Sequence, residues 1–271
     1  MSELDIAICT YKPQGMEKVA SEVMPPSPGI RYVVSWQDHN NTPLPQSISS
    51  RNDVRVFRYD ETGLSNNRNN AINHCESDIV LISDDDLQFH SEAIKKIAEI
   101  FKDRPEMDIA VFKIKFPLTK KYPEKEQKLS LPLPKGYYAS SVELAFRRSQ
   151  IGNLRFWPEL GLGNSFYQAG EDELFLISAI KRGLNVRFID LEIAIHPTMS
   201  TGDKVSPGIL RGQGFIMGIL YPFSSLARIP VKAYRNYKSR KSTFWLSLKE
   251  LGKGYLHSVK KTKTIPHCYR W

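Results

Sequence analysis

The sequence has few cysteines, and none of them lie close together. Cys9, Cys75 and Cys268 are odd in number, and no CxxC pair occurs. This pattern argues against a disulfide framework and a structural zinc site and is typical of a protein in a reducing compartment. The 271-residue chain is long enough to bury a core without such cross-links.

Long apolar runs are also missing. The longest stretch without charge, residues 212–227, spans 16 residues and contains Gln213 and Pro222. A membrane-spanning helix needs about 20 mostly apolar residues. The first residues show no basic segment followed by an apolar one, so we expect no cleaved signal peptide. The sequence therefore argues against an integral membrane protein.

Several motifs of common enzyme classes are absent. The chain contains no GxxxxGK[ST] loop, no GxGxxG after a strand, no HExxH and no GxSxG. Kinase-like, dinucleotide-dependent, zinc-protease and α/β-hydrolase functions therefore lose support.

Positive charge is present in excess, and it is concentrated near the C-terminal end. The chain has 38 basic and 29 acidic residues, a net charge of +9. Residues 228–271 hold twelve basic residues and one acidic residue, Glu250, so they carry +11 and the first 227 residues carry −2. We therefore divide the chain into a domain of residues 1–227 and a basic C-terminal extension of residues 228–271. The extension suits docking on an anionic membrane surface, a merely solvated helical segment, or binding of nucleic acid or another partner.

Short apolar segments alternate with helical patterns along the chain. This alternation predicts an α/β fold in which helices flank a doubly wound, mainly parallel central sheet. Ligands of such sheets bind beyond the carboxyl ends of the strands. The expected strands are residues 4–10, 30–36, 54–59, 79–83, 109–116, 142–147 and 186–195, and the expected helices are residues 15–23, 66–74, 91–101 and 171–183.

Three adjacent carboxylates, Asp84, Asp85 and Asp86, directly follow the expected strand at residues 79–83. Such neighbours raise each other's pKa unless a cation lies among them. Mg²⁺ or Mn²⁺ usually binds one or two carboxylates together with the phosphates of a substrate. The run therefore predicts a divalent ion that bridges the protein and a diphosphate. The alternative is a solvated acidic turn before the next helix.

Four further polar residues are candidates either for catalysis and ligand binding or for a structural role. Glu171 and Asp172 open a helix, where the helix dipole favours acids and where a general base is also well placed. His196 follows a strand and is either a packed residue or a metal contact beside the aspartates. Arg68 lies near the start of a helix, where it suits an anionic ligand or simply a polar helix face.

Taken together and in order, these residues resemble the family 2 glycosyltransferases, which have the GT-A fold. The matching parts are the family's opening strand ending in Thr-Tyr-Asn, its G-x-S-x-A-R-N-x-G-I helix, its strand with a DxD motif, its acceptor loop and its ED motif. The resemblance covers roughly residues 4–200 and implies a single Rossmann-like domain. The corresponding segments here are residues 6–12, 63–72, 78–86, 156–163 and 170–175.

The resemblance implies how the donor is bound. Thr10 and Tyr11 would line the nucleotide pocket, with Arg68 beside the uridine or the phosphates. Asp84 would hold the ribose or the donor sugar, and Asp85 is counted among the same nucleotide-binding residues.

One departure from the family concerns the base. The family usually ends its second strand in Asp-Asp-Gly-Ser, whereas this chain has Trp36-Gln37-Asp38-His39. Either Gln37 or Asp38 would read the base, so the identity of the base stays open.

The resemblance also implies a metal-dependent, inverting mechanism. Asp86 would bind Mn²⁺ or Mg²⁺ with His196 as a further ligand, Asp172 would be the catalytic base, and Glu171 would support the acceptor. The implied reaction moves a sugar from a nucleotide-diphosphate donor, above all a UDP-sugar, to a hydroxyl of a glycan or lipid-linked saccharide in surface polysaccharide synthesis.

Two consequences for partners follow. We expect a cytoplasmic enzyme, held peripherally on the inner face of the membrane if the basic extension docks there. The alternative is a non-catalytic module that binds a nucleotide-sugar or nucleic acid through residues 228–271. A pure binder, however, has no need of the acidic run, the ED pair and the histidine in the family's order.

Overall fold

The computed structural model describes residues 3–117, 120–197, 205–261 and 263–270. These residues form two compact units. The first comprises the described residues of 1–62, 66–153 and 179–199, and the second comprises those of 63–65, 154–178 and 200–271.

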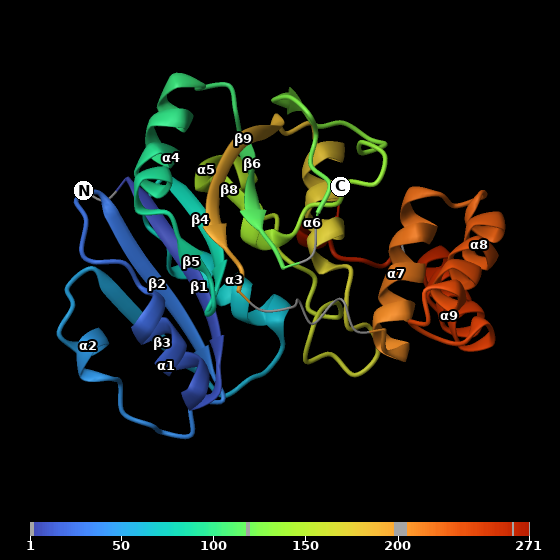
Figure 1. Cartoon of the computed structure of the whole chain (residues 1–271), viewed down its shortest axis with the longest axis horizontal. Helices are drawn as coiled ribbons and strands as arrows, with labels where there is room; N and C mark the ends of the chain where they lie inside the picture. The colour runs from blue at the N-terminus through green and yellow to red at the C-terminus, as the bar shows by residue number, and fades with distance from the viewer. Residues whose placement is uncertain (1–2, 118–119, 198–204, 262, 271) are drawn as a thin grey trace. The chain divides into compact units, whose positions relative to one another are not determined.

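The first unit contains a nine-stranded sheet (Figure 1). The strand order is β3-β2-β1-β4-β8-β6-β9-β5, and β7 pairs with β9 outside this path. The strands β3, β2, β1 and β4 are mutually parallel, as are β6 and β9, whereas β8 runs antiparallel between β4 and β6. The strands are β1 (Leu4–Tyr11), β2 (Ile30–Gln37), β3 (Val54–Tyr59), β4 (Ile79–Asp84), β5 (Gln88–Phe89), β6 (Ile109–Lys115), β7 (Gln127–Lys128), β8 (Leu144–Arg147) and β9 (Val186–Ile195).

Helices alternate with the strands in the first part of the chain, and further helices follow the last strand. They include one-turn helices and two short 3₁₀ turns. The predicted α/β fold with a mainly parallel sheet and flanking helices is therefore confirmed. The helices are α1 (Lys12–Glu22), α2 (Gln46–Ser49), α3 (Leu64–His74), α4 (Ser91–Asp103), η1 (Ser141–Glu143), α5 (Arg148–Ile151), α6 (Glu171–Lys181), α7 (Pro207–Leu220), α8 (Ser225–Lys238), α9 (Phe244–Lys261) and η3 (His267–Tyr269).

The central strand β1 shows why this sequence forms a covered sheet. Leu4, Ile6 and Ile8 point to one face, where they share an apolar core with α1 and α4. Ala7 and Cys9 alternate with them, point to the other face and are also buried. A strand that is covered on both faces can be apolar on both, as β1 is from Ile6 to Cys9.

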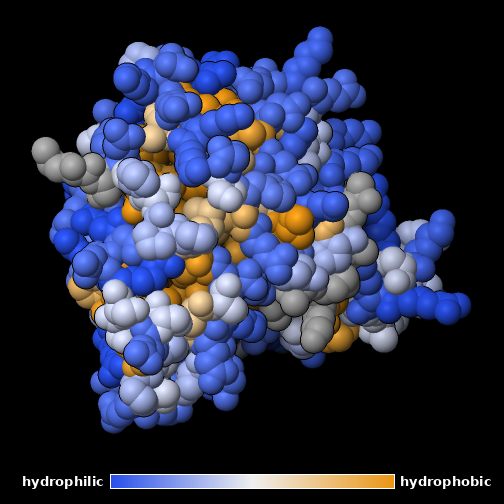
Figure 2. Space-filling model, turned by 60° about the vertical axis from the view of Figure 1, so that its left-hand side comes forward, coloured by the Kyte–Doolittle hydropathy of each residue, from blue (hydrophilic) through white to orange (hydrophobic). Residues whose placement is uncertain are grey.

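Helix α4 has one apolar face. Ala93, Ile94, Ile97 and Phe101 recur at spacings of three or four residues and are buried, while the opposite face of the helix is polar. Figure 2 shows a mostly hydrophilic face of the protein, with hydrophobic residues visible only in patches between polar ones.

In the second unit, α7 and α9 pack closely through glycines. A Cβ atom on Gly214 would lie 2.0 Å from the carbonyl oxygen of Leu251, and one on Gly254 would lie 2.0 Å from that of Arg211. Both helices therefore need glycine at these contacts. Within the described ranges, no helix is both long enough and apolar enough to cross a membrane.

The boundary predicted between residues 227 and 228 falls inside α8. Leu210 of α7, Ile229 of α8 and Leu251 of α9 form one small apolar cluster. The division of the chain into residues 1–227 and 228–271 stays a prediction.

Candidate functional site

The carboxyl ends of three neighbouring parallel strands meet at one edge of the sheet. In the strand registers, Cys9 of β1 pairs with Asp84 of β4, and Tyr11 of β1 pairs with Gln37 of β2. Thr10 lies between these two positions of β1. The expected donor-binding residues of the three strands therefore lie side by side.

The three adjacent aspartates contact three different partners. Asp84 lies 3.4 Å from the guanidinium of Arg68, measured from Oδ1 to Nη2. Asp85 accepts a 2.7 Å hydrogen bond from the hydroxyl of Thr10. Asp86 Oδ1 lies 3.5 Å from Nε2 of His196. Pointing the carboxylates at separate partners reduces their mutual repulsion and gives each one a different environment.

The surroundings of Asp85 shift its pKa. Burial raises its pKa to about 6, although the Thr10 hydroxyl and the ammonium of Lys18 lower it in part. Lys18 lies on α1, with Nζ 3.8 Å from Asp85 Oδ1. Asp85 is therefore held on the α1 side of the strand end, against Thr10.

Gly15 allows this contact to form. A Cβ atom on this residue would lie 2.2 Å from Oγ1 of Thr10 and 2.6 Å from Oδ2 of Asp85. The sequence analysis did not identify Gly15 or Lys18, because the only signal was a glycine near a predicted strand end, which is common in turns.

Arg68 is buried, with only 2% of its surface exposed. It lies on α3 together with Asn67, whose side-chain amide donates a 2.9 Å hydrogen bond to the carbonyl oxygen of Thr10. This bond ties α3 to the end of β1. Asn67 is a third residue that the sequence alone did not single out, although it lies within the block that resembles the family's helix.

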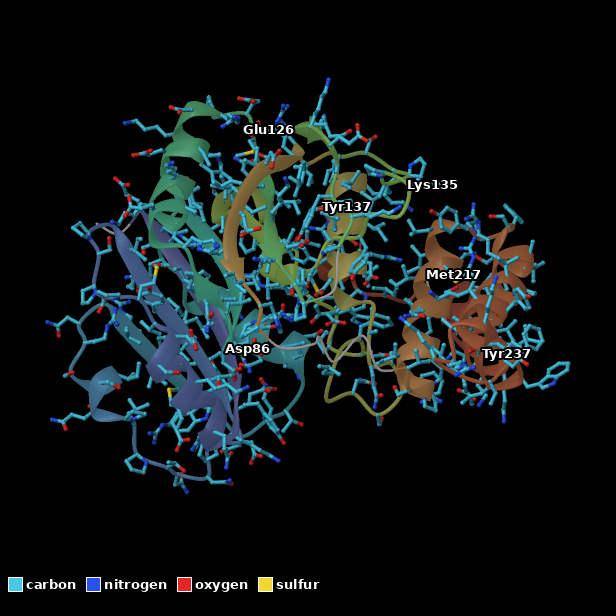
Figure 3. All side chains as sticks on the ribbon, in the orientation of Figure 1. Asp86, Glu126, Lys135, Tyr137, Met217 and Tyr237 are labelled. Carbon is cyan, nitrogen blue, oxygen red and sulfur yellow. The ribbon has the colours of Figure 1, made fainter. Side chains whose placement is uncertain are left out.

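His196 reaches the acidic run from the last strand of the sheet. Its backbone N–H donates to the carbonyl oxygen of Lys115 at the end of β6, and its ring stacks on Phe116 with 5.6 Å between centroids. These contacts orient the imidazole, which is 8% exposed, toward Asp86. The side chain of Asp86 is labelled in Figure 3.

The described part of the chain contains no group of three or more side chains that would hold a metal ion by themselves. Asp86 and His196 nevertheless offer a hard oxygen and an imidazole nitrogen 3.5 Å apart. Mg²⁺ and Mn²⁺ commonly take only one or two protein ligands and complete their shell with phosphate oxygens and water. This donor pair fits an ion that is bound jointly with a diphosphate.

Gln37 and Asp38 differ in their settings. Gln37 ends β2 between Tyr11 and Tyr59, is 2% exposed, and its Nε2 has no hydrogen-bond partner among the described residues. Asp38 follows in the left-handed region, with φ of 51°. A buried amide without a partner is costly unless a ligand or water completes it, so the end of β2 holds a donor that such a molecule would satisfy.

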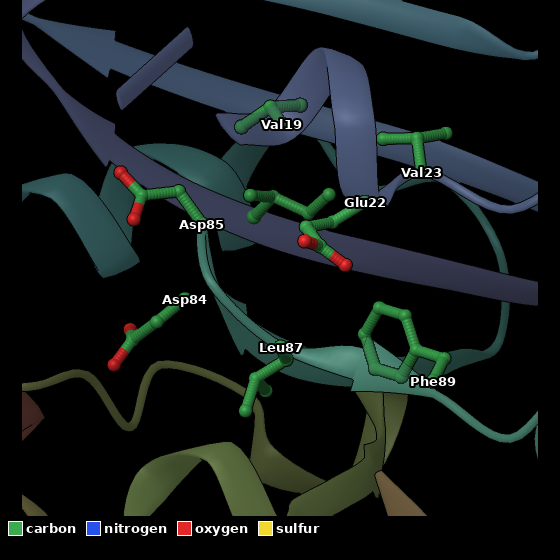
Figure 4. Close-up of a pocket in the computed structure, with 8 residues that line it drawn as sticks. Val19, Glu22, Val23, Asp84, Asp85, Leu87 and Phe89 are labelled. Carbon is green, nitrogen blue, oxygen red and sulfur yellow. The ribbon is translucent and has the colours of Figure 1, made fainter. Parts of the chain in front are cut away.

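A small depression lies beside the acidic run (Figure 4). Asp84 and Asp85 border it at the end of β4, and its other lining residues are mostly apolar. Leu87 and Phe89, which follow the acidic run, form part of this apolar lining. The depression therefore borders the polar cluster without containing Thr10, Arg68 or His196.

The ED pair lies in the second unit, at the start of α6. Gly170 precedes it with φ of +103°, and a Cβ atom there would lie 2.8 Å from the side chain of Ile216. Glu171 is buried at 7% exposure, whereas Asp172 is partly exposed in the first turn of the helix. Asp172 is thus the carboxylate of the pair that solvent or a substrate can reach.

The loop of residues 156–163 packs against this helix start. Gly161 has φ of +99°, and a Cβ atom there would lie 3.0 Å from Cδ of Glu171 and 3.2 Å from Oγ of Ser65. The Ser65 hydroxyl also donates a 2.7 Å hydrogen bond to the carbonyl oxygen of Leu160. Three segments that matched the family separately in sequence are therefore joined within the second unit.

Comparison with protein families supports the resemblance. Residues 38–161 match the family model for Glycosyl transferase family 2. The match includes the acidic run and Arg68, so the predicted resemblance is confirmed over this range. A comparison with curated protein sequences finds no match.

Crystal structures of TarS from S. aureus are similar to this chain. The complex of TarS 1–349 with UDP-GlcNAc has a TM-score of 0.61 and 19% identity, covering 98% of this chain and 82% of that one. The complex with UDP has a TM-score of 0.60 and 18% identity, covering 88% of this chain and 72% of that one. At these identities the likeness establishes the fold, and the predicted GT-A fold is confirmed.

Proposed function

We propose that this chain, whose residues 38–161 match the family 2 glycosyltransferases, moves a sugar from a nucleotide-diphosphate donor to a hydroxyl of an acceptor. The observation that carries the proposal is the cluster at the sheet edge. There Asp84 faces Arg68, Asp85 bonds to Thr10, and Asp86 faces His196. Such a cluster combines cationic, acidic and imidazole groups around the point where doubly wound sheets bind their ligands.

The donor would bind across the ends of β1, β2 and β4. Thr10 and Tyr11 line the nucleotide side, Arg68 lies beside the uridine or phosphates, and Asp84 accepts from the ribose or donor sugar. Asp85 holds Thr10 in place from the α1 side. The UDP and UDP-GlcNAc complexes of TarS support a uridine diphosphate donor.

Recognition of the base falls to the end of β2. The side-chain amide of Gln37 can donate to a carbonyl oxygen of uracil and so complete its own buried Nε2 group. Asp38 then lies just outside the strand.

Asp86 and His196 would hold Mn²⁺ or Mg²⁺ together with the diphosphate. The ion would supply positive charge to the leaving diphosphate. Arg68 would add to that charge from the protein side, since its guanidinium is buried and therefore little screened by water.

Asp172 would act as the catalytic base. Its carboxylate takes the proton of the acceptor hydroxyl while the oxygen forms a bond to the anomeric carbon. The bond between that carbon and the diphosphate oxygen breaks, and its electron pair leaves with the nucleotide diphosphate. Attack from the face opposite the leaving group inverts the anomeric configuration. The buried Glu171 would support the acceptor from the same helix turn.

The acceptor would be a glycan or a lipid-linked saccharide, in surface polysaccharide synthesis. We place the enzyme in the cytoplasm, peripherally at the inner face of the membrane. The free cysteines Cys9, Cys75 and Cys268 support a reducing compartment, and the charge of residues 228–271 supports attachment to anionic lipid.

A donor screen tests the proposal. Wild-type protein is incubated with nucleotide-sugars and Mn²⁺, and both release of nucleotide diphosphate and thermal stabilisation are measured. We expect at least one donor, a UDP-sugar first, to give both signals, and chelation of the metal to weaken them. Asp86→Ala should lose the metal-dependent part of nucleotide binding, whereas Asp103→Ala on the exposed end of α4 should keep it. Stabilisation by nucleotides without turnover of any donor would instead indicate a binding module.

A further inference from the structure

Helix α9 has its polar and apolar faces arranged in an unusual way. Its buried positions are mostly small or polar, with Ser247, Gly254 and Ser258 among them. Its exposed positions include large apolar side chains: Trp245 is 74% exposed, and Leu256 and Val259 are each 58% exposed. An apolar face that turns outward needs an explanation, because solvent-facing helix surfaces are normally polar.

Lysines border this apolar face. Trp245, Lys249, Lys253, Leu256 and Lys260 recur at spacings of three or four residues, so they share one side of the helix. All five are exposed. This side of α9 therefore combines large apolar side chains with positively charged ones and carries no acidic residue.

Glu250, the one acidic residue in the sequence of residues 228–271, does not lie on that side of α9. Glu250 is 4% exposed and is bound by Arg211 on α7, with 2.7 Å between the charged atoms, and by Lys253 at 2.9 Å. Among the lysines of that side it pairs with Lys253 alone, and the rest of its compensation comes from Arg211 inside the unit.

Helix α8 repeats the pattern. Ser225, Ile229, Ala233 and Asn236 form its buried side, while Leu226 and Tyr234 are exposed at 68% and 57%. Tyr237, labelled in Figure 3, is 60% exposed on the same helix. Phe223, just before α8, is 89% exposed. Exposed basic residues occur on α8 as well: Arg228, Arg235 and Lys238.

We infer that the exposed side of α9, together with the exposed apolar side of α8, docks on an anionic phospholipid membrane. We call these two helix faces the α8–α9 surface. Interfacial helices place aromatic and aliphatic groups at the headgroup boundary and lysines against anionic headgroups. Each basic residue near such a surface contributes about 1 kcal/mol of attraction, which is about a fivefold change in binding.

Two other occupants fit less well. A second copy of the chain would bring two strongly basic surfaces together, which like-charge repulsion disfavours. Nucleic acid would use the lysines and aromatic rings, but it offers nothing for exposed leucine and valine side chains to pack against. The mixture of aliphatic groups with positive charge is what lipid accommodates.

Vesicle binding by the full-length protein tests the inference. The probes are vesicles of phosphatidylglycerol and phosphatidylcholine in equal parts, and vesicles of phosphatidylcholine alone. We expect sedimentation with the anionic vesicles, much weaker sedimentation with the neutral ones, and a blue shift of tryptophan emission on binding. Lys249→Glu with Lys260→Glu should weaken anionic-vesicle binding at least about tenfold. Trp245→Ser with Leu256→Ser should weaken it similarly and remove the blue shift.

The control is charge reversal at Lys96 and Lys102, which are exposed on α4 of the first unit. Lys96→Glu with Lys102→Glu changes the net charge equally and should leave vesicle binding within about threefold. All the substituted residues are exposed, so circular dichroism melting should show each variant folded.

Vesicle binding that is absent, or equal in all variants, would overturn the inference. The inference would also be overturned if the protein bound an oligonucleotide or formed a dimer, the α9 variants abolished that complex, and no variant bound vesicles. None of these residues belongs to the donor site, so vesicle binding and sugar transfer can fail independently.

Discussion

At the scale of single residues, the proposed donor site includes a glycine that contributes no chemistry. Gly15 leaves room for the hydrogen bond between Thr10 and Asp85, since a Cβ atom would lie 2.2 Å and 2.6 Å from their side-chain oxygens. Gly15→Ala should push these two side chains apart and lower nucleotide affinity about tenfold, or about 1.4 kcal/mol. Calorimetric titration with UDP measures the change.

Gly252→Ala is the matched control, because a Cβ atom there would meet nothing within 4 Å. Alanine should stabilise α9 by up to about 1 kcal/mol and leave nucleotide affinity unchanged. Equal nucleotide affinity in both variants would show that the contact between Thr10 and Asp85 is not needed for donor binding.

The sequence predicts which residues lie at the edge of the sheet, but it does not predict where their side chains point. The rule that parallel strands end at one edge brought Thr10, Gln37 and Asp84 together correctly. The divergence of the acidic run toward separate partners depends on α1, α3 and β9, which approach from distant parts of the chain. No local pattern encodes where Asp85 points, so its bond to Thr10 could not be predicted.

At the scale of elements, one buried carboxylate joins the start of β1 to its neighbours. Asp5 is fully buried, pairs with Arg31 of β2 at 2.8 Å, and accepts hydrogen bonds from the backbone N–H groups of Glu76 and Ser77 before β4. Burial acts to raise the pKa of Asp5, but the bonds from Arg31 and Ser77 outweigh it, and the pKa is lowered. Asp5 therefore stabilises the fold when it is charged.

The pH dependence follows from this direction. Because the pKa of Asp5 is lower in the folded than in the unfolded chain, its contribution is present above the ordinary value of 3.8 and is lost as the pH falls below it. Asp5→Asn should reduce the free energy of unfolding at neutral pH by about 3 kcal/mol and flatten the acid limb of the stability curve. Urea unfolding at several pH values measures both.

Asp78→Asn serves as the comparison for Asp5→Asn. Asp78 also pairs with an arginine, Arg147, at 2.9 Å, but its side chain is 55% exposed. Its loss should change stability by only about 0–1 kcal/mol. If both variants behaved alike, the buried network at Asp5 would not be the anchor that its contacts indicate.

Elements with a strong apolar pattern could be predicted from the sequence, and weakly patterned ones could not. The bounds of β3 and β9 agree with the prediction to the residue, and those of β1, β2 and β4 differ at one end by one residue. The two-residue strands β5 and β7 are too short to show any periodicity. The predicted strand at residues 142–147 begins two residues later, because Ser140 and Glu143 form a capping box around a 3₁₀ turn. The insertion of β8 between β4 and β6 follows from long-range packing, which no local pattern reports.

At the scale of the whole molecule, the basic region contributes to the core of the second unit as well as to its charge. Ile229 and Leu251 pack with Leu210 of α7, and Gly214 and Gly254 allow α7 and α9 to pack closely. Truncation after residue 227 should therefore uncover the apolar face of α7 and cause aggregation. Size-exclusion chromatography and dye binding to exposed apolar surface measure this. A monomeric truncated protein with unchanged melting would instead support an independent extension of residues 228–271.

The charge distribution of the chain could be predicted from the sequence, whereas the α8–α9 surface could not. Counting residues places +11 in residues 228–271. Only the structure shows that most inward-facing residues of α8 and α9 are small or polar, apart from Ile229 and Leu251, whereas Trp245, Leu256 and Tyr234 are exposed. Helical periodicity alone would have placed the apolar side in the core.

Substitution of Asp172 tests whether this chain transfers a sugar with that carboxylate as the base. Release of nucleotide diphosphate from the donor is measured for wild type, Asp172→Asn and Glu173→Gln, with nucleotide affinity measured in parallel. Glu173 is the neighbouring acid in the same helix turn and has no assigned part in the chemistry. We expect Asp172→Asn to lower turnover about 10²–10⁴-fold, nucleotide affinity to stay within about threefold, and Glu173→Gln to remain active. Turnover by Asp172→Asn close to that of wild type would contradict the assignment of Asp172 as the base.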